Sequence, residues 1–143
     1  MLSMKKIMTL AVSALLFAGT AQANDFHRCE TGASPQAEYV LHFDTGKSDI
    51  KPEGKIELKK AADRAKYMLD VCVVGQADNQ GNQEYNKKLA LKRAKVVAAE
   101  LAKLGVPKST LVTLVQGEAF GDKLTKMIGK QKQSRRVSIR LMR

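Results

Sequence analysis

The chain is short and basic, with 143 residues, 25 lysines and arginines against 14 acidic residues, and a formal net charge of +11. This length suits one domain, or one domain plus a targeting segment, with enough residues for one sizeable core. The positive charge suits a polyanionic partner, either nucleic acid, anionic lipid or a carboxylate-bearing cell-wall polymer. The alternative is a basic surface that is simply solvated.

The first 23 residues have the pattern of a secretory signal. Lys5 and Lys6 precede a short apolar run, and the segment closes on the small residues of "AQA". A charged start, an apolar stretch and a small-residue end predict a signal peptide over residues 1–23. The alternative, a membrane anchor, needs roughly 20 apolar residues, more than this run has. Cleavage removes both lysines and lowers the formal charge from +11 to +9, and export makes nucleic acid the least accessible partner.

Residues 24–37 are polar and are predicted to form an N-terminal extension. Cys29 lies in this extension, and Cys72 lies in a predicted strand. In the oxidising compartment that export implies, two cysteines favour a disulfide, with two unpaired thiols as the alternative. Two distant cysteines, with His27 and His42 at no ligand spacing, do not make a zinc pattern, so no metal or cofactor is expected.

The folded domain is predicted over residues 38–143 and starts with a strand and a helix. "EYVLHF" (38–43) is the first predicted strand, followed by the polar "DTGKSD". Pro52 marks a helix start, where its missing N–H costs nothing. Over residues 53–69 apolar side chains recur at helical spacing with lysines between them. "DVCVVG" (70–75) is the second predicted strand, apolar enough that we expect burial on both faces.

The second half of the domain repeats the alternation. Residues 85–104 predict a long helix that Gly105 and Pro107 stop. Residues 109–117 and 134–142 predict two more strands, separated by a loop. The order β-α-β-α-β-β predicts an α/β fold, a two-layer sandwich with helices packed on a mixed sheet. After the signal, no segment is apolar enough to span a membrane.

One charged residue breaks the pattern of the second predicted helix. At about 100° per residue its lysines mostly point away from the apolar arc, but Arg93 falls at the edge of that arc, on the same face as Asn86. A buried unpaired charge is very costly, so Arg93 needs an anionic partner or a route to solvent. Asp78 is the natural partner because it follows the second strand, and the three side chains are expected to converge. Both a structural Asp–Arg pair and a pocket for a zwitterionic ligand fit this arrangement.

The stretch "GQADNQGNQEYNKKLALKRAKVVAAEL" resembles the signature of the OmpA-like peptidoglycan-binding domain, G-H-T-D-x-x-G-x-x-x-x-N-x-x-L-S-x-x-R-A-x-x-V. The residues in register are Gly75, Asp78, Gly81, Asn86, Leu89, Arg93, Ala94 and Val97. "FDTGKSDIKPEG" resembles the first strand and loop of that family, and "SRRVSIRL" resembles its closing N-R-R-V strand, with Arg135 and Arg136 in place. The likeness covers about residues 38–143.

The resemblance implies a binding site for the diaminopimelate of the peptidoglycan stem peptide. By this resemblance Asp78 takes the ligand ammonium and Arg93 its carboxylate, for which the planar guanidinium fork is better suited than lysine. The family pattern also implies a supporting amide, a backbone lining and a bordering cation, which are Asn86, the Thr45-Gly46 segment and Arg135.

Four positions depart from the family pattern. Gln76 and Ala77 replace the His-Thr before the aspartate, Ala90 replaces a serine, and Ser134 replaces the asparagine of N-R-R. The central Asp, Asn and Arg are kept, so we expect binding that is weaker or has an altered ligand preference.

Three classes of function follow. The leading hypothesis is a soluble periplasmic peptidoglycan-binding module, associated with the cell wall or outer membrane. The alternative is a wall-anchored adaptor that docks on an envelope protein complex. An enzyme acting on the wall is disfavoured, because the serines have no triad context and no paired carboxylates are apparent.

Overall fold

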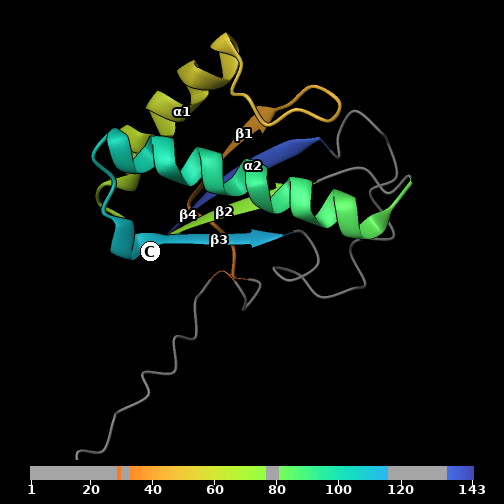
Figure 1. Cartoon of the computed structure of the whole chain (residues 1–143). Helices are drawn as coiled ribbons and strands as arrows, with labels where there is room; N and C mark the ends of the chain where they lie inside the picture. Colours follow the sequence, from red (N-terminus) through yellow and green to blue (C-terminus); the bar gives the residue numbers. More distant parts are fainter. Residues whose placement is uncertain (1–28, 30–32, 77–80, 116–134) are drawn as a thin grey trace, which may run out of the picture.

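A computed structural model describes residue 29 and residues 33–76, 81–115 and 135–143 of the chain. The predicted signal peptide and most of the N-terminal extension lie outside these residues, as does the predicted loop before the last strand. The elements, in chain order, are β1 (Ala37–His42), α1 (Pro52–Ala65), β2 (Asp70–Gln76), α2 (Gln83–Lys103), the 3-10 turn η1 (Lys108–Thr110), β3 (Leu111–Val115) and β4 (Arg136–Met142) (Figure 1).

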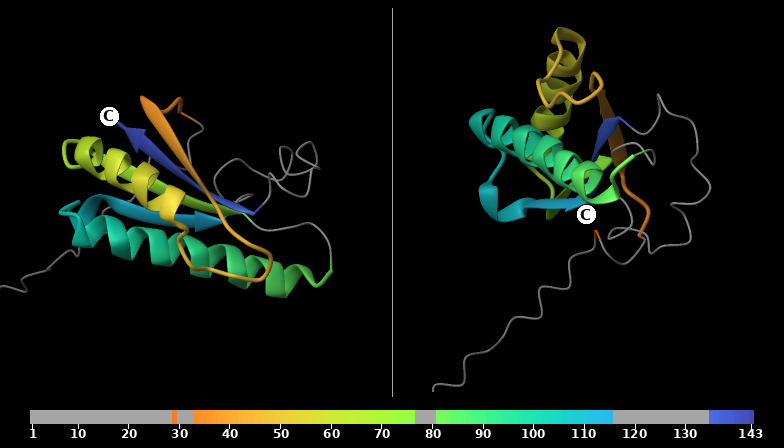
Figure 2. Two further views of the ribbon diagram at one scale, coloured as in Figure 1. Left: turned by 90° about the horizontal axis from the view of Figure 1, so that it is seen from above. Right: turned by 45° about the vertical axis from the view of Figure 1, so that its right-hand side comes forward.

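The strands form one mixed sheet with the order β1-β4-β2-β3. β4, the last strand in sequence, lies between β1 and β2 and is antiparallel to both, whereas β2 and β3 are parallel. Both helices lie on the same side of this sheet, α1 over β1 and α2 over β2 and β3 (Figure 2). The predicted two-layer sandwich with β-α-β-α-β-β order is therefore confirmed.

The helix boundaries differ from the prediction at the end of α1. The helix was expected to continue to residue 69, but it ends at Ala65, where the N–H of Lys66 donates to the carbonyl of Ala62. The chain then turns into β2, which leaves Tyr67 84% exposed and Leu69 59% exposed. Apolar spacing alone could not mark this end, because the turn is dictated by where β2 has to enter the sheet.

Two further expectations about local structure need correction. Ile56 is one of the apolar residues at helical spacing in the predicted helix over residues 53–69, yet it is 60% exposed. The third strand starts at Leu111 instead of residue 109, because residues 108–110 form η1, in which the Thr110 hydroxyl donates to the Pro107 carbonyl at 2.8 Å. Residues 116 and 117, predicted as the end of that strand, lie outside the described residues.

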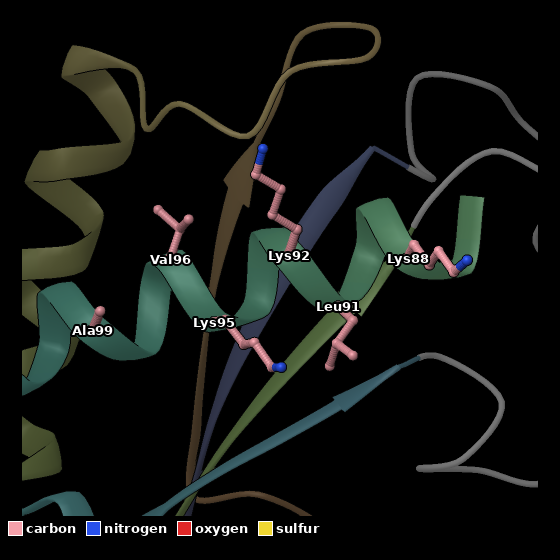
Figure 3. A pocket seen from close by; sticks show the side chains of 6 residues that line it. All are labelled: Lys88, Leu91, Lys92, Lys95, Val96 and Ala99. Atoms are coloured by element: carbon pink, nitrogen blue, oxygen red, sulfur yellow. The ribbon is translucent and has the colours of Figure 1, made fainter. Parts of the chain in front are cut away.

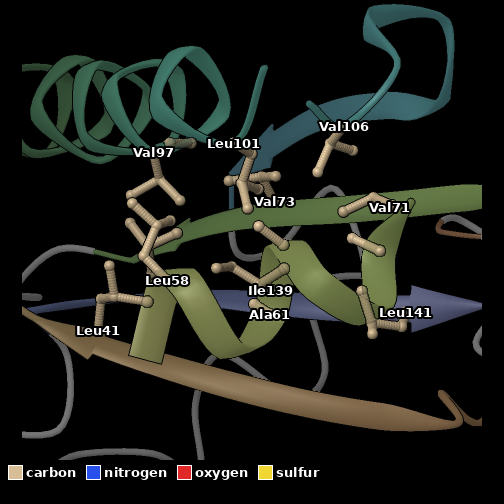
Figure 4. Packing of buried hydrophobic residues seen from close by; sticks show 14 of the residues in the cluster. Leu41, Leu58, Ala61, Val71, Val73, Val97, Leu101, Val106, Ile139 and Leu141 are labelled. Carbon is tan, nitrogen blue, oxygen red and sulfur yellow. The ribbon is translucent and has the colours of Figure 1, made fainter. Parts of the chain in front are cut away.

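The main core lies between the sheet and the helices (Figure 4). In β2, Val71 and Val73 face this core, while Cys72 and Val74 belong to a second cluster on the opposite face of the sheet. Every residue of β2 after Asp70 is buried, so the expected burial on both faces is confirmed. Because close-packed interiors are rigid, this burial fixes the position of the C-terminal end of β2.

A disulfide joins Cys29 to Cys72, with the two Cα atoms 5.7 Å apart, as the sequence predicted. Both cysteines are buried, and they pack with Val74, Leu114 and Met142 on the sheet face that carries no helix. The bridge therefore ties the N-terminal extension covalently to the centre of the sheet.

In the part of the chain that the structure describes, neither helix is both long and apolar enough to cross a membrane.

Candidate functional site

The C-terminal end of β2 and the first half of α2 touch through their backbones at Gly75. A Cβ atom at this position would lie 2.0 Å from the carbonyl oxygen of Ala90 and 2.7 Å from its carbonyl carbon. Only glycine permits so close an approach. The contact places the buried face of α2, including Arg93, directly beside the end of the strand.

Two residues of the polar stretch before α2, Gly81 and Asn82, set where the helix starts. Gly81 has a φ of 82°, a left-handed conformation that glycine adopts without strain. Asn82 is the N-cap, and its side-chain oxygen accepts a hydrogen bond from the N–H of Tyr85 at 3.0 Å. The cap starts the helix at Gln83, two residues before the predicted start. Asp78 and Ala77 lie outside the described residues.

Arg93 is the central polar side chain of the described site. It is 0% exposed, deeper than the arc-edge position that the helical wheel predicts. Its Nε donates to the Lys47 carbonyl at 2.8 Å, and its NH2 group donates to the Asp44 carbonyl at 2.9 Å. Its NH1 group is 3.5 Å from the Gln76 carbonyl, and the guanidinium lies 5.3 Å from the centre of the Phe43 ring.

These contacts explain how a charge is tolerated at this depth. The main chain between β1 and α1, residues 43–51 (the β1–α1 segment), brings two carbonyl oxygens down to the helix. Hydrogen bonds to a charged donor are stronger than neutral ones, so Arg93 pins this segment to the end of β2. The helical wheel could not reveal this role, because the acceptors lie 46 and 49 residues away in sequence.

The β1–α1 segment has an exposed turn at Thr45 and Gly46, the two residues expected to line the site. Gly46 has a φ of 69°, and the N–H of Lys47 closes the turn on the Asp44 carbonyl at 3.1 Å. Arg93 holds both ends of this turn through the carbonyls of Asp44 and Lys47. The hydrogen bonds from Arg93 therefore hold the backbone of the Thr45-Gly46 turn in place.

The β1–α1 segment carries two acidic residues, Asp44 and Asp49, and two lysines, Lys47 and Lys51, so the excess of positive charge at this site comes from Arg93 and Arg135. The Lys51 ammonium is 2.8 Å from the Asp44 carboxylate, and this hydrogen bond lowers the pKa of Asp44, an effect reinforced by the charges of Lys47 and Arg135. The same contact raises the pKa of Lys51.

Arg135 and its neighbour connect β4 to the site. The carbonyl of Arg135 accepts a hydrogen bond from the N–H of Phe43 at 2.8 Å, which fixes its position beside the β1–α1 segment. Arg136 donates through Nε to the side-chain oxygen of Gln76 at 3.1 Å. Gln76, one of the departures from the family pattern, is thus buried with a partner of its own.

The structure therefore brings four of the six predicted site residues to one edge of the sheet, namely Thr45, Gly46, Arg93 and Arg135. Asn86 is half-buried in the second turn of α2, seven residues before Arg93 and on the same face. Sequence reasoning did not assign roles to Asp44, Lys47 and Lys51, although the turn signal "DTGK" marks the place where they occur.

The model of the OmpA family matches residues 42–136, well over half of the chain. The chain belongs to the OmpA family. It is 31% identical over 102 residues to outer membrane protein A of Bordetella avium, covering 70% of this chain and 53% of that protein. It is also 32% identical over 80 residues to a peptidoglycan-associated lipoprotein of Agrobacterium fabrum, covering 54% of this chain and 45% of that protein. The chain thus spans about half the length of these curated relatives.

The fold of this OmpA-family chain also matches solved structures. The crystal structure of the peptidoglycan-associated lipoprotein from Burkholderia pseudomallei superposes with a TM-score of 0.58 at 23% identity, covering 71% of this chain and 88% of that one. This likeness shows a shared fold. The match of the OmpA family to residues 42–136 confirms the family predicted from the "GQADNQGNQEYN" stretch.

Proposed function

We propose that the chain is a non-catalytic peptidoglycan-binding protein of the periplasm, associated with the cell wall or outer membrane. Membership of the OmpA family supports this proposal, as does the similarity to proteins named as outer membrane or peptidoglycan-associated. The observation that carries it is the clamp of Arg93 on the β1–α1 segment, which holds an exposed backbone turn within a cationic edge. A rigid, positively charged edge suits a carboxylate-bearing ligand.

The proposed ligand is the zwitterionic end of diaminopimelate in the stem peptide. In this proposal Asp78 binds the ammonium group, and the positive charge of Arg93 and Arg135 attracts the carboxylate. The Thr45-Gly46 backbone lines the site and Asn86 supports it. Each charge-assisted hydrogen bond contributes roughly 1.5–3 kcal/mol, and immobilising the ligand offsets much of that. A single stem peptide should therefore bind weakly, on the order of micromolar to millimolar.

The deciding variant is Asp78→Asn, which removes the charge and keeps the shape. Arg93 is a poor first choice because its loss also releases the β1–α1 segment. The matched control is Asp63→Asn on α1, an exposed carboxylate whose partner Lys66 lies 3.7 Å away. Isothermal titration with a diaminopimelate stem peptide should show at least a roughly tenfold loss for Asp78→Asn, equal to about 1.4 kcal/mol, and no loss for Asp63→Asn.

Two outcomes would contradict the proposal. One is a folded Asp78→Asn protein that binds stem peptide and purified sacculi as well as the parent does. The other is the release of soluble muropeptides from sacculi by the purified chain, which would reveal catalysis. A stem peptide with its free carboxylate amidated tests the cationic side independently, and it should bind as poorly as the Asp78→Asn variant binds the natural peptide.

A further inference from the structure

The outward face of α2 carries a group of lysines that the proposed wall site does not use. Lys88, Lys92 and Lys95 stand on this face together with Leu91, Val96 and Ala99 (Figure 3). We call these six residues the basic face. At about 100° per residue they share an arc of about 140°, opposite the side of the helix that packs on the sheet.

Charges of opposite sign are separated along α2. Its two acidic residues, Glu84 and Glu100, stand near its ends, and all the charged side chains of the 15 residues between them are basic. Lys88 lies 3.6 Å from Glu84. Among the residues that the structure describes, no acidic side chain lies within 4.0 Å of the ammonium of Lys92 or Lys95.

The other helix shows a different arrangement. On α1, acidic and basic residues are interleaved, with Lys60 2.8 Å from Glu57 and Lys66 3.7 Å from Asp63. Like charges spaced three or four residues apart, as in the basic face, destabilise a helix slightly. Among the described residues, no acidic side chain offsets the repulsion at Lys92 and Lys95. This uncompensated repulsion indicates that the basic face has a binding partner outside the described fold.

The shape of the basic face restricts its partner. The face borders a shallow hollow of about 450 Å³ that is lined by this one helix and is open to solvent. Small-molecule sites enclose most of the ligand surface, and a single helix face does not. Its apolar members are small or aliphatic, and none is aromatic, so the face lacks the anchor residues of a protein-interface hot spot. A flat anionic surface suits the basic face better, because it does not require each lysine to meet one particular partner group.

We propose that the basic face adsorbs to bilayers containing anionic phospholipid. The three lysines are attracted to the headgroup charge, and Leu91 and Val96, at the two margins of the arc, add a small apolar contact. At about 100° per residue Arg93 points about 100–160° away from the three lysines, and it is buried. The lysines can therefore be replaced without changing a residue of the proposed wall site, and the two proposals are tested separately.

The test is co-sedimentation of the exported chain with vesicles made of equal parts of phosphatidylcholine and phosphatidylglycerol. Phosphatidylcholine vesicles report any binding that does not depend on lipid charge, including that of an uncleaved apolar leader. The variant Lys88→Gln/Lys92→Gln/Lys95→Gln should bind the anionic vesicles roughly 100-fold more weakly than the parent, and added salt should weaken the parent.

The matched control is Lys55→Gln/Lys59→Gln/Lys60→Gln, which removes the same charge from α1 and should keep most of the binding. Equal losses in both triple variants would show that only total charge matters, and would overturn the proposal. Parent protein that ignores anionic vesicles would also overturn it. If the α2 triple variant loses retention on sacculi but binds vesicles like the parent, the face contacts the wall polymer and the lipid proposal is wrong.

Discussion

Replacing Gly75 by alanine should be among the most damaging single-methyl changes in this protein. The added Cβ would lie 2.0 Å from the Ala90 carbonyl oxygen and 3.3 Å from the Ala94 Cβ atom. The obstructing atoms belong mainly to the backbone of α2, so no side-chain rotation relieves the overlap. The helix or the strand must move by about an ångström or more, which disturbs a close-packed interior.

The expected cost is at the upper end of the range for overpacking, about 3 kcal/mol. The matched control is Gly54→Ala in α1. There the nearest atom is a side-chain methyl, Ile50 Cγ2, at 3.2 Å, which has to move by only a few tenths of an ångström. Alanine also favours the helix over glycine by about 0.5–1 kcal/mol. Gly54→Ala should therefore be near neutral or slightly stabilising, although it buries the same methyl group.

Urea unfolding followed by circular dichroism measures both variants. With a slope of about 1–3 kcal/mol/M, a loss of about 3 kcal/mol lowers the urea midpoint by roughly 1–3 M. The movement of α2 should also displace Arg93 from the β1–α1 segment, so stem-peptide binding should fall in conditions where the variant remains folded. A Gly75→Ala protein as stable as the parent, or a Gly54→Ala protein destabilised equally, would refute the reasoning.

Three further predictions concern the bridge, the clamp and the exposed ion pair. Cys29→Ser/Cys72→Ser should lower the free energy of unfolding by about 4 kcal/mol in the chain-entropy model, because the bridge spans a sequence separation of 43; a smaller urea midpoint shift than that of Gly75→Ala would contradict this. Arg93→Met should cost about 1–3 kcal/mol, the penalty for the Lys47 carbonyl that loses its donor, because the Asp44 carbonyl keeps a hydrogen bond from the Lys47 N–H. Unchanged thermal unfolding would contradict the clamp. Asp44 has a pKa below its ordinary 3.8, chiefly because Lys51 donates a hydrogen bond to it. Its stabilisation is therefore complete above that value and lost as pH falls through the lower folded pKa, so unfolding of Asp44→Asn should depend less on pH in this acid range.

Local patterns in the sequence were enough to predict the order and type of the elements. The continuous apolar run of β2 predicted burial on both faces, and the periodicity of residues 85–104 predicted α2. The two cysteines predicted their bridge because an exported chain offers few alternatives. These features depend on residues a few positions apart or on the composition of the whole chain. Both kinds of information can be read directly from the sequence.

The tertiary structure decided the features that depend on contacts between distant segments. The place of β4 between β1 and β2, the early end of α1 and the exposure of Ile56 all follow from how the elements pack. Arg93 is the clearest case. Its position in the helix could be read from the sequence, but the carbonyls of Asp44 and Lys47 that accept its hydrogen bonds reach it from another part of the chain. Backbone acceptors carry no sequence signal, so a buried charge that they satisfy is visible only in three dimensions.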